Sequence, residues 1–314
     1  MQLTSVPAML NIALYSFAVL ANVLLLWIFL KFPALRAKQC LYLIAALALA
    51  DLCYALFTTL LLVVGILNNA NMVGPFSKLT CINMNAPASG WLVAEQVLIL
   101  SIAWDRFDAF HSHVTYRHKK HRVYAQRSLL SAITAGCVTA ALGYMNVDYS
   151  TVLPRCGIIV AYTKAFVMLM ALALISCSIA VLLLYVAAYI LMRQASKKYQ
   201  TSVSRDRALE RQLKATKAIF TLLSCYCVLW FAPIILFVVA YSAAVSDQFL
   251  KALEHVLNVC MALNCAVNTV IYAAKYEDIR KFLVVCLKGK KGVQPIIVCP
   301  KTPKQKNNLA ELKV

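Results

Sequence analysis

The feature that most constrains this chain is a series of apolar stretches, each long enough to cross a bilayer. A helix needs about 20 apolar residues to span the hydrocarbon. Such stretches cover residues 10–30, 41–67, 79–110, 128–145, 158–192, 218–244 and 250–274, and the fourth, the shortest, is the weakest prediction among them. The chain is 62% hydrophobic and 14% charged, against about 25% charged for soluble domains. The sequence therefore predicts an all-α membrane protein, a seven-transmembrane helix bundle.

The positions of the basic residues orient this bundle. The 31 Lys and Arg residues give a formal net charge of +19, which would suggest nucleic acid if they clustered on a soluble domain. They lie instead in the gaps between apolar stretches, and only Lys78, Arg155, Lys164 and Lys251 fall on one set of connections. Since basic loops stay cytoplasmic, we expect an extracellular N-terminus and a cytoplasmic C-terminus. Membrane lipids, not nucleic acid, are the expected partner of the basic loops.

Four segments follow from these patterns. Residues 1–9 form a short extracellular N-terminus, 10–274 the transmembrane domain, 275–288 a juxtamembrane helix and 289–314 a disordered basic tail. In the third segment Ile279, Phe282, Leu283 and Cys286 recur with helical spacing, which predicts an amphipathic helix in the headgroup region. Cys286 is either a palmitoylation site or a cysteine that faces lipid.

Two cysteines lie at predicted extracellular ends. Cys81 lies at the start of the third long apolar stretch, and Cys156 lies in the loop after the fourth. An oxidising compartment permits a disulfide there, and nearly every other cysteine lies within a span, at a cytosolic end or in the tail. We favour a bridge that holds a lid over the helices; two unpaired cysteines are the alternative.

Ionisable residues inside apolar stretches are candidates for function because lipid disfavours charge. Asp105 and Arg106 close the third stretch, where they can form an ion pair that a change of environment releases. Alternatively, Arg106 extends to the lipid headgroups. Asp51 and Glu95 are the two acids within the bilayer, and Glu95 lies three helical turns before Arg106 on the same face.

Taken together, these motifs resemble the rhodopsin-like (class A) G-protein-coupled receptors from about residue 11 to 288. The family's D-R-Y, its L-x-x-x-D and its N-P-x-x-Y are matched by Asp105-Arg106-Phe107, by Leu47 to Asp51 and by Asn268 to Tyr272. Asn22 matches the asparagine of the family's first helix, and Cys81 has the family's spacing from Arg106. The short termini and the Asn-Thr-x-x-Tyr variant are similar to nematode serpentine chemoreceptors of the Srsx-like group.

The resemblance implies a receptor that transmits an extracellular ligand's signal to a heterotrimeric G protein by outward movement of the sixth helix. The implied activation switch comprises Asp105, Arg106, Phe231, Pro233, Asn268 and Tyr272. Some positions depart from the family. The fourth span lacks its tryptophan, the fifth lacks its proline, and Thr269 replaces the proline of N-P-x-x-Y, so the last helix should bend less.

The resemblance also assigns an internal site to the two buried acids. The counterpart of Asp51 binds a sodium ion in the family, and Glu95 occupies the position of a hydroxyl ligand. With Asn264 and Asn268 nearby, the two carboxylates can hold a cation. They can also share one proton, which we favour because burying paired like charge is costly.

The family's ligand pocket maps onto eight positions: Ala88, Ser89, Leu92, Ile234, Ile235, Val238, His255 and Asn258. Because Ala88 stands where amine receptors keep an acid, a biogenic amine is not expected. A mostly apolar lining with one His and one Asn suits a small, weakly polar chemosensory molecule. A peptide that contacts the loops is the alternative ligand.

Two other classes of membrane protein fit less well. A transporter or channel is disfavoured because inverted repeats and broken mid-membrane helices are not evident. An intramembrane enzyme is disfavoured because Glu254-His255 lacks the second histidine of His-Glu-x-x-His. We therefore expect no enzymatic activity and no cofactor, with sodium at Asp51 and Glu95 as the one candidate ion.

Overall fold

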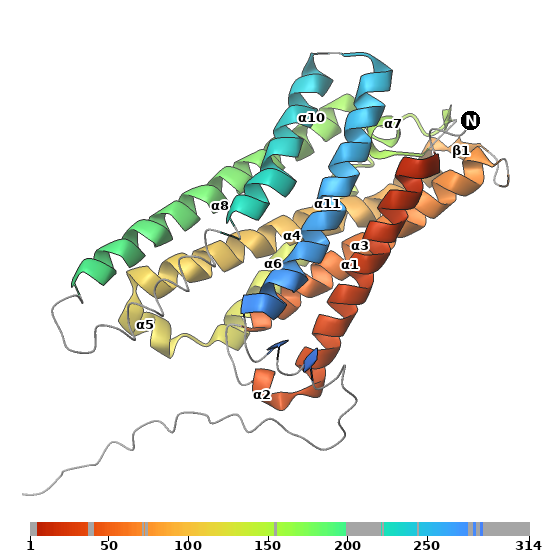
Figure 1. Cartoon of the computed structure of the whole chain (residues 1–314). Helices are drawn as coiled ribbons and strands as arrows, with labels where there is room; N and C mark the ends of the chain where they lie inside the picture. Colours follow the sequence, from red (N-terminus) through yellow and green to blue (C-terminus); the bar gives the residue numbers. More distant parts are fainter. Residues whose placement is uncertain are drawn as a thin grey trace, which may run out of the picture.

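The structure is a computed structural model, and it describes residues 5–36, 41–70, 72, 75–153, 156–198, 221, 223–243, 245–275, 279–280 and 283–284. Its long helices run alongside one another as a bundle (Figure 1). They are α1 (Ser5–Lys31), α3 (Leu41–Asn69), α4 (Lys78–His111), α6 (His121–Leu142), α8 (Lys164–Lys198), α10 (Ala232–Ser242) and α11 (Asp247–Lys275). A π-helical turn, η1 (Cys227–Phe231), leads directly into α10.

Short elements mark the two ends of the bundle. At one end lie the start of α1, the helix α7 (Ile158–Ala161) and the strand β1 (Phe76–Ser77), which pairs antiparallel with β2 (Val152–Leu153). At the other end lie α2 (Pro33–Arg36) and α5 (His113–His118) (Figure 1). The predicted extracellular and cytoplasmic connections thus gather at opposite ends.

Six segments of the described chain are long and apolar enough to cross a membrane: α1, α3, α4, α8, Leu223–Ser242 and α11. Their outward side chains are apolar, as lipid requires: Leu20, Leu183 and Val228 are each more than 60% exposed. α6 is the remaining long helix and is less apolar, because His121, Arg122 and Arg127 occupy its first two turns. Its 22 residues still extend about 33 Å, close to the thickness of the hydrocarbon.

The structure corrects the predicted start of the fifth span. The sequence suggested one helix from residue 158, but α7 and α8 are separate elements, and α8 begins at Lys164. Tyr162 breaks the helix with an extended backbone, φ −96° and ψ 162°. The backbone N–H of Phe166 then donates to Thr163 Oγ1 over 3.3 Å, the bond by which a threonine caps a helix start. This capping signal was present in the sequence and was missed.

The predicted juxtamembrane helix falls mostly outside the described residues. Ile279 is buried and Leu283 is half-buried, each in a short helical piece. Phe282, Cys286 and the segment 289–314 lie outside the described residues. The amphipathic helix, its lipidation and the tail therefore stay predictions.

A pair of glycines brings α4 against α6. A Cβ atom on Gly136 would lie 2.5 Å from the backbone oxygen of Gly90, and one on Gly90 would lie 2.9 Å from that of Gly136. Two backbones in direct contact is the arrangement that small residues permit in membrane proteins. The tryptophan that the family places in the fourth span is absent here, and this glycine contact joins the two helices.

We expect Gly136→Ala to lower the thermal stability of the purified protein in detergent. The added methyl group meets backbone that cannot rotate away, and overpacking of this kind costs about 1–3 kcal/mol. Gly65→Ala is the matched control, because nothing lies within 4 Å of the position of its Cβ. Equal melting temperatures for Gly136→Ala and the parent would contradict the close contact.

Candidate functional site

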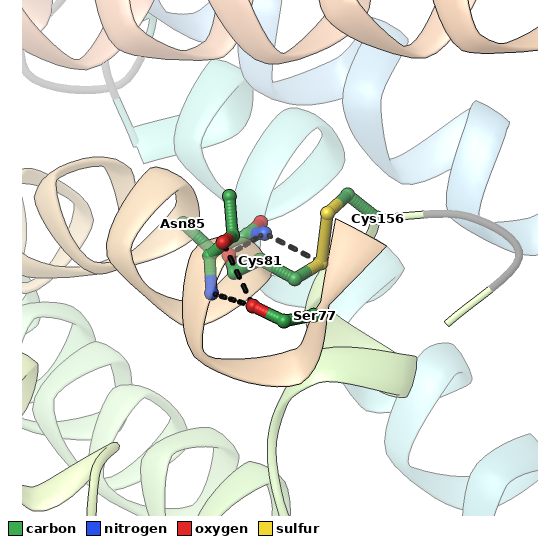
Figure 2. The surroundings of a disulfide bond; sticks show 5 residues. Ser77, Cys81, Asn85 and Cys156 are labelled. Atoms are coloured by element: carbon green, nitrogen blue, oxygen red, sulfur yellow. Dashed lines mark hydrogen bonds between the residues drawn. A yellow bond between two sulfur atoms is a disulfide. The ribbon is translucent and has the colours of Figure 1, made fainter. Parts of the chain in front are cut away.

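A disulfide fixes the loop between α6 and α8 to the end of α4. Cys81, fully buried in the first turn of α4, is bonded to Cys156, and their Cα atoms lie 5.3 Å apart. Figure 2 shows Asn85 beside the bridge, where its Nδ2 donates to the backbone oxygen of Cys81 over 2.8 Å. The predicted bridge is therefore confirmed, and unpaired cysteines are excluded.

Hydrogen bonds continue this attachment along the same loop. The backbone N–H of Lys78 donates to the oxygen of Thr151, next to the β1–β2 pairing. Ser150, through its hydroxyl and its backbone N–H, donates to Asp148 and holds the pKa of that exposed carboxyl below its usual value. These bonds favour the ionised carboxylate and join neighbouring residues of the loop.

Asp51 on α3 and Glu95 on α4 meet in the centre of the bundle. Both side chains are fully buried, and each accepts one amide hydrogen bond from α11. Asn268 Nδ2 lies 3.2 Å from Asp51 Oδ2, and Asn264 Nδ2 lies 2.7 Å from Glu95 Oε1. The structure thus assembles all four residues of the predicted ion or proton site.

The second oxygen of each carboxylate remains available. Asp51 Oδ1 and Glu95 Oε2 are buried and make no hydrogen bond among the described residues. One ligand atom each of Asp51, Glu95 and the buried Cys265 lie within 4.8 Å of one another. Two buried carboxylates this close would repel each other if both were ionised. The sequence did not indicate the thiol, since a cysteine in an apolar helix usually serves packing.

The predicted Asn22 joins α1 to α11. Its Nδ2 donates to the backbone oxygen of Ala18 at 2.9 Å and to that of Cys265 at 3.2 Å. Thr269 Oγ1 donates back to Asn22 Oδ1 over 2.9 Å. The threonine that replaces the family's proline therefore adds a bond between helices, and α11 continues unbroken to Lys275.

At the end of α4 opposite the disulfide, Asp105 contacts several polar side chains. Its carboxylate is fully buried and lies 3.6 Å from the guanidinium of Arg106. The hydroxyl of Tyr116 in α5 donates to it over 3.0 Å, and the ammonium of Lys119 lies 3.4 Å away. The predicted ion pair is present, yet the loop after α4 supplies the shorter contacts. The sequence did not identify Tyr116 and Lys119, because their pairing depends on how that loop folds back.

The sixth transmembrane segment contains the π turn just before Pro233. Proline has no N–H, so a carbonyl in the preceding turn loses its helical hydrogen bond. A wider turn is one way for the helix to accommodate that loss. Trp230 is completely buried, whereas Phe231 is only half-buried. Spacing from the proline pointed to Phe231 as the aromatic of the switch, and the structure places Trp230 deepest in the core.

A cavity of about 30 Å³ lies beside these elements, room for about two water molecules. Its lining comes from α3, α4, α8, α11 and the segment before η1: Leu47, Ile99, Ile102, Tyr185, Cys225, Tyr226, Asn264, Asn268, Ile271 and Tyr272. Tyr185 and Tyr272 thus share one cavity, whereas Tyr189, one helical turn further along α8, is 40% exposed.

The eight predicted ligand residues lie on α4, α10 and α11. Ala88, Ser89, Leu92 and Ile234 are buried, and Ile235, Val238, His255 and Asn258 are half-buried. The Oγ of Ser89 lies 3.3 Å from the hydroxyl of Tyr162, and His255 Nδ1 is buried with no hydrogen-bond partner among the described residues. None of the eight lines the 30 Å³ cavity, so their role stays a prediction.

The bundle, the disulfide at one end and the aspartate–arginine pair at the other define a multi-pass membrane receptor of the G-protein-coupled type. Residues 15–285 match the model of the serpentine-type 7TM GPCR chemoreceptor family Srsx. The chain belongs to this family, a class of receptors and not of enzymes. Comparison with curated proteins finds no significant match. The family match confirms the resemblance proposed from the motifs.

We expect Cys81→Ser, Cys156→Ser and the double variant to lose the same stability, roughly 2–5 kcal/mol for a bridge that closes a long loop. Thermal unfolding of the purified proteins measures the loss, with Cys137→Ser, an exposed free cysteine, as control. A double variant less stable than either single variant would contradict a bond shared by the two residues.

Proposed function

We propose that this chain is a plasma-membrane receptor that transmits an extracellular chemical signal to a heterotrimeric G protein. The observation that carries the proposal is a fully buried Asp105 that lies beside Arg106 at the end of α4 opposite the disulfide. A buried carboxylate that is held by a few contacts forms an ion pair that a conformational change can break. Family membership supports ligand binding and coupling in general.

In this proposal α6 is a seventh span, the N-terminus is extracellular and the C-terminus is cytoplasmic. Two features support that topology. The disulfide requires an oxidising side and lies at the end of the bundle that holds the start of α1. The basic residues of α2 and α5 lie at the other end, as expected for the cytoplasmic side.

The proposed ligand enters beneath the disulfide-bonded loop. It is a small, weakly polar organic molecule that contacts the apolar residues of α4 and α10 together with His255 and Asn258. Among the described residues His255 Nδ1 has no hydrogen-bond partner. This favours a ligand with one hydrogen-bonding group, because a buried nitrogen without a partner is costly. A peptide that rests on the loops is the second candidate ligand.

Binding then shifts the bundle toward an arrangement in which the sixth segment swings outward. The π turn and Pro233 supply the hinge, because the helical hydrogen-bond ladder is already interrupted there. Arg106 leaves Asp105 and turns toward the cavity shared by Tyr185 and Tyr272. The cleft opened at the cytoplasmic end receives the G protein.

Arg106→Ala should abolish agonist-stimulated nucleotide exchange while surface expression stays near that of the parent. Agonists would come from a screen of volatile alcohols, ketones and esters in cells that carry a promiscuous G-protein α subunit. Arg122→Ala, an exposed arginine of α6, is the matched control and should signal normally. Full signalling by Arg106→Ala would contradict the proposed switch.

We further propose that Asp51 and Glu95 hold one proton, or alternatively one sodium ion, in the resting state. In the first case the melting temperature of the purified receptor varies with pH and is the same in sodium and choline chloride. In the second case it rises with sodium and not with choline. Glu95→Ser should weaken the pH dependence, since one of the two carboxylates is lost. Asp51→Asn combined with Glu95→Gln should remove either dependence, since no carboxylate then remains to hold a proton or a cation. A parent protein insensitive to both pH and sodium would contradict the site.

A further inference from the structure

A second buried polar cluster ties the sixth transmembrane segment to α4 and α8. The hydroxyl of Tyr226 donates to Gln96 Oε1 over 2.7 Å, and its oxygen lies 2.8 Å from Ser178 Oγ. Tyr226 is 6% exposed, Gln96 1% and Ser178 0%. We call these three residues the Tyr226 clamp.

The Tyr226 clamp includes a residue of α8, the span in which this chain lacks the proline of its family. α8 has no proline in this region and remains a regular helix, so the Ser178 hydroxyl lies 2.8 Å from the backbone oxygen of Leu174. A further contact joins the same two helices, from Cys177 Sγ to the backbone oxygen of Gln96 at 3.6 Å. α4 and α8 are thus joined to each other, and Tyr226 of the sixth transmembrane segment bonds to residues of both helices.

Tyr226 also stands at the point where the sixth segment can hinge. It is the residue immediately before the π turn Cys227–Phe231, and its side chain lines the cavity of about 30 Å³. If the segment below Pro233 swings outward, the phenol must leave Gln96 and Ser178. Gln96 Nε2 already lacks a hydrogen-bond partner among the described residues, so withdrawal of Tyr226 would leave its amide without either bond.

We propose that the Tyr226 clamp holds the receptor in its resting arrangement and sets its ligand-independent activity. Tyr226 is the positioning residue, and Gln96 with Ser178 are its anchors. This inference rests on the proposed receptor function. The physical reason is that the hydroxyl of Tyr226 and its partners keep these hydrogen bonds only in the resting arrangement, and little water is present in the interior to replace them. A ligand must then bind the open arrangement more tightly by at least the free energy of these bonds.

The test is Tyr226→Phe, which removes one hydroxyl and keeps the ring. In nanodiscs with a purified G protein and no added ligand, nucleotide exchange should rise roughly 2- to 10-fold, the effect of one lost buried hydrogen bond. Tyr15→Phe is the matched control, because this fully buried phenol bonds Tyr54 between α1 and α3 at 3.5 Å. It should leave basal exchange unchanged.

A double variant tests whether the bond itself is responsible. Gln96→Met keeps the length of the side chain and removes its acceptor. If Tyr226 and Gln96 act through one bond, the double variant should have the same basal exchange as Tyr226→Phe. Independent, multiplicative increases, or an equal rise in Tyr15→Phe, would overturn the proposal. So would unchanged exchange in Tyr226→Phe where the parent itself catalyses exchange.

A second readout separates this inference from the proposed function. Cys225 lines the cavity next to Tyr226, so outward movement of the sixth segment should speed its reaction with a water-soluble maleimide. The rate is taken from the part of the labelling that is lost in Cys225→Ser. Tyr226→Phe should accelerate it by a similar factor without any G protein. Faster labelling with no nucleotide exchange in any variant would refute the receptor function and leave the clamp standing. If the parent does catalyse exchange and Tyr226→Phe is labelled at the parent's rate, the clamp is refuted.

Discussion

The rest of this structure depends on one constraint, the scarcity of water between helices that stand in lipid. A polar side chain there must find a partner on another helix or remain unsatisfied at high cost. The protein meets this constraint at three depths. Asn22 joins α1 to α11, the two acids meet amides of α11, and Tyr226 meets α4 and α8. Each polar group therefore specifies which helices must be neighbours.

α4 carries polar groups of the candidate site at both ends of the bundle and between them. It begins at the disulfide that holds the outer loop and ends at the buried Asp105. Between these points it contributes Glu95 to the acid site and Gln96 to the Tyr226 clamp, on adjacent positions of one helix. Its contact with α6 through Gly90 and Gly136 keeps it close to a neighbour, so a displacement at one end is not absorbed by loose packing.

Much of the candidate site was accessible from the sequence because its residues are chemically unusual for their surroundings. Asp51 and Glu95 are acids in apolar stretches, and the structure places them together with Asn264 and Asn268. Cys81 and Cys156 were distinguished by position and are bonded. Tyr226, Ser178 and Lys119 were not identified, because tyrosine and serine are common in membrane helices and lysine is common in basic loops. Their importance lies in which side chains they meet.

The sequence by itself determined the class of fold, the ends of most helices and the basic side of the bundle, because apolar length and charge act locally along the chain. It also determined which ionisable groups would be buried. Only the tertiary structure decided that Trp230 and not Phe231 fills the core, that Cys265 approaches two carboxylates, and that Thr269 bonds Asn22. These outcomes depend on the rotation and depth of each helix relative to its neighbours, which are set by packing between distant segments and leave no local signal in the chain.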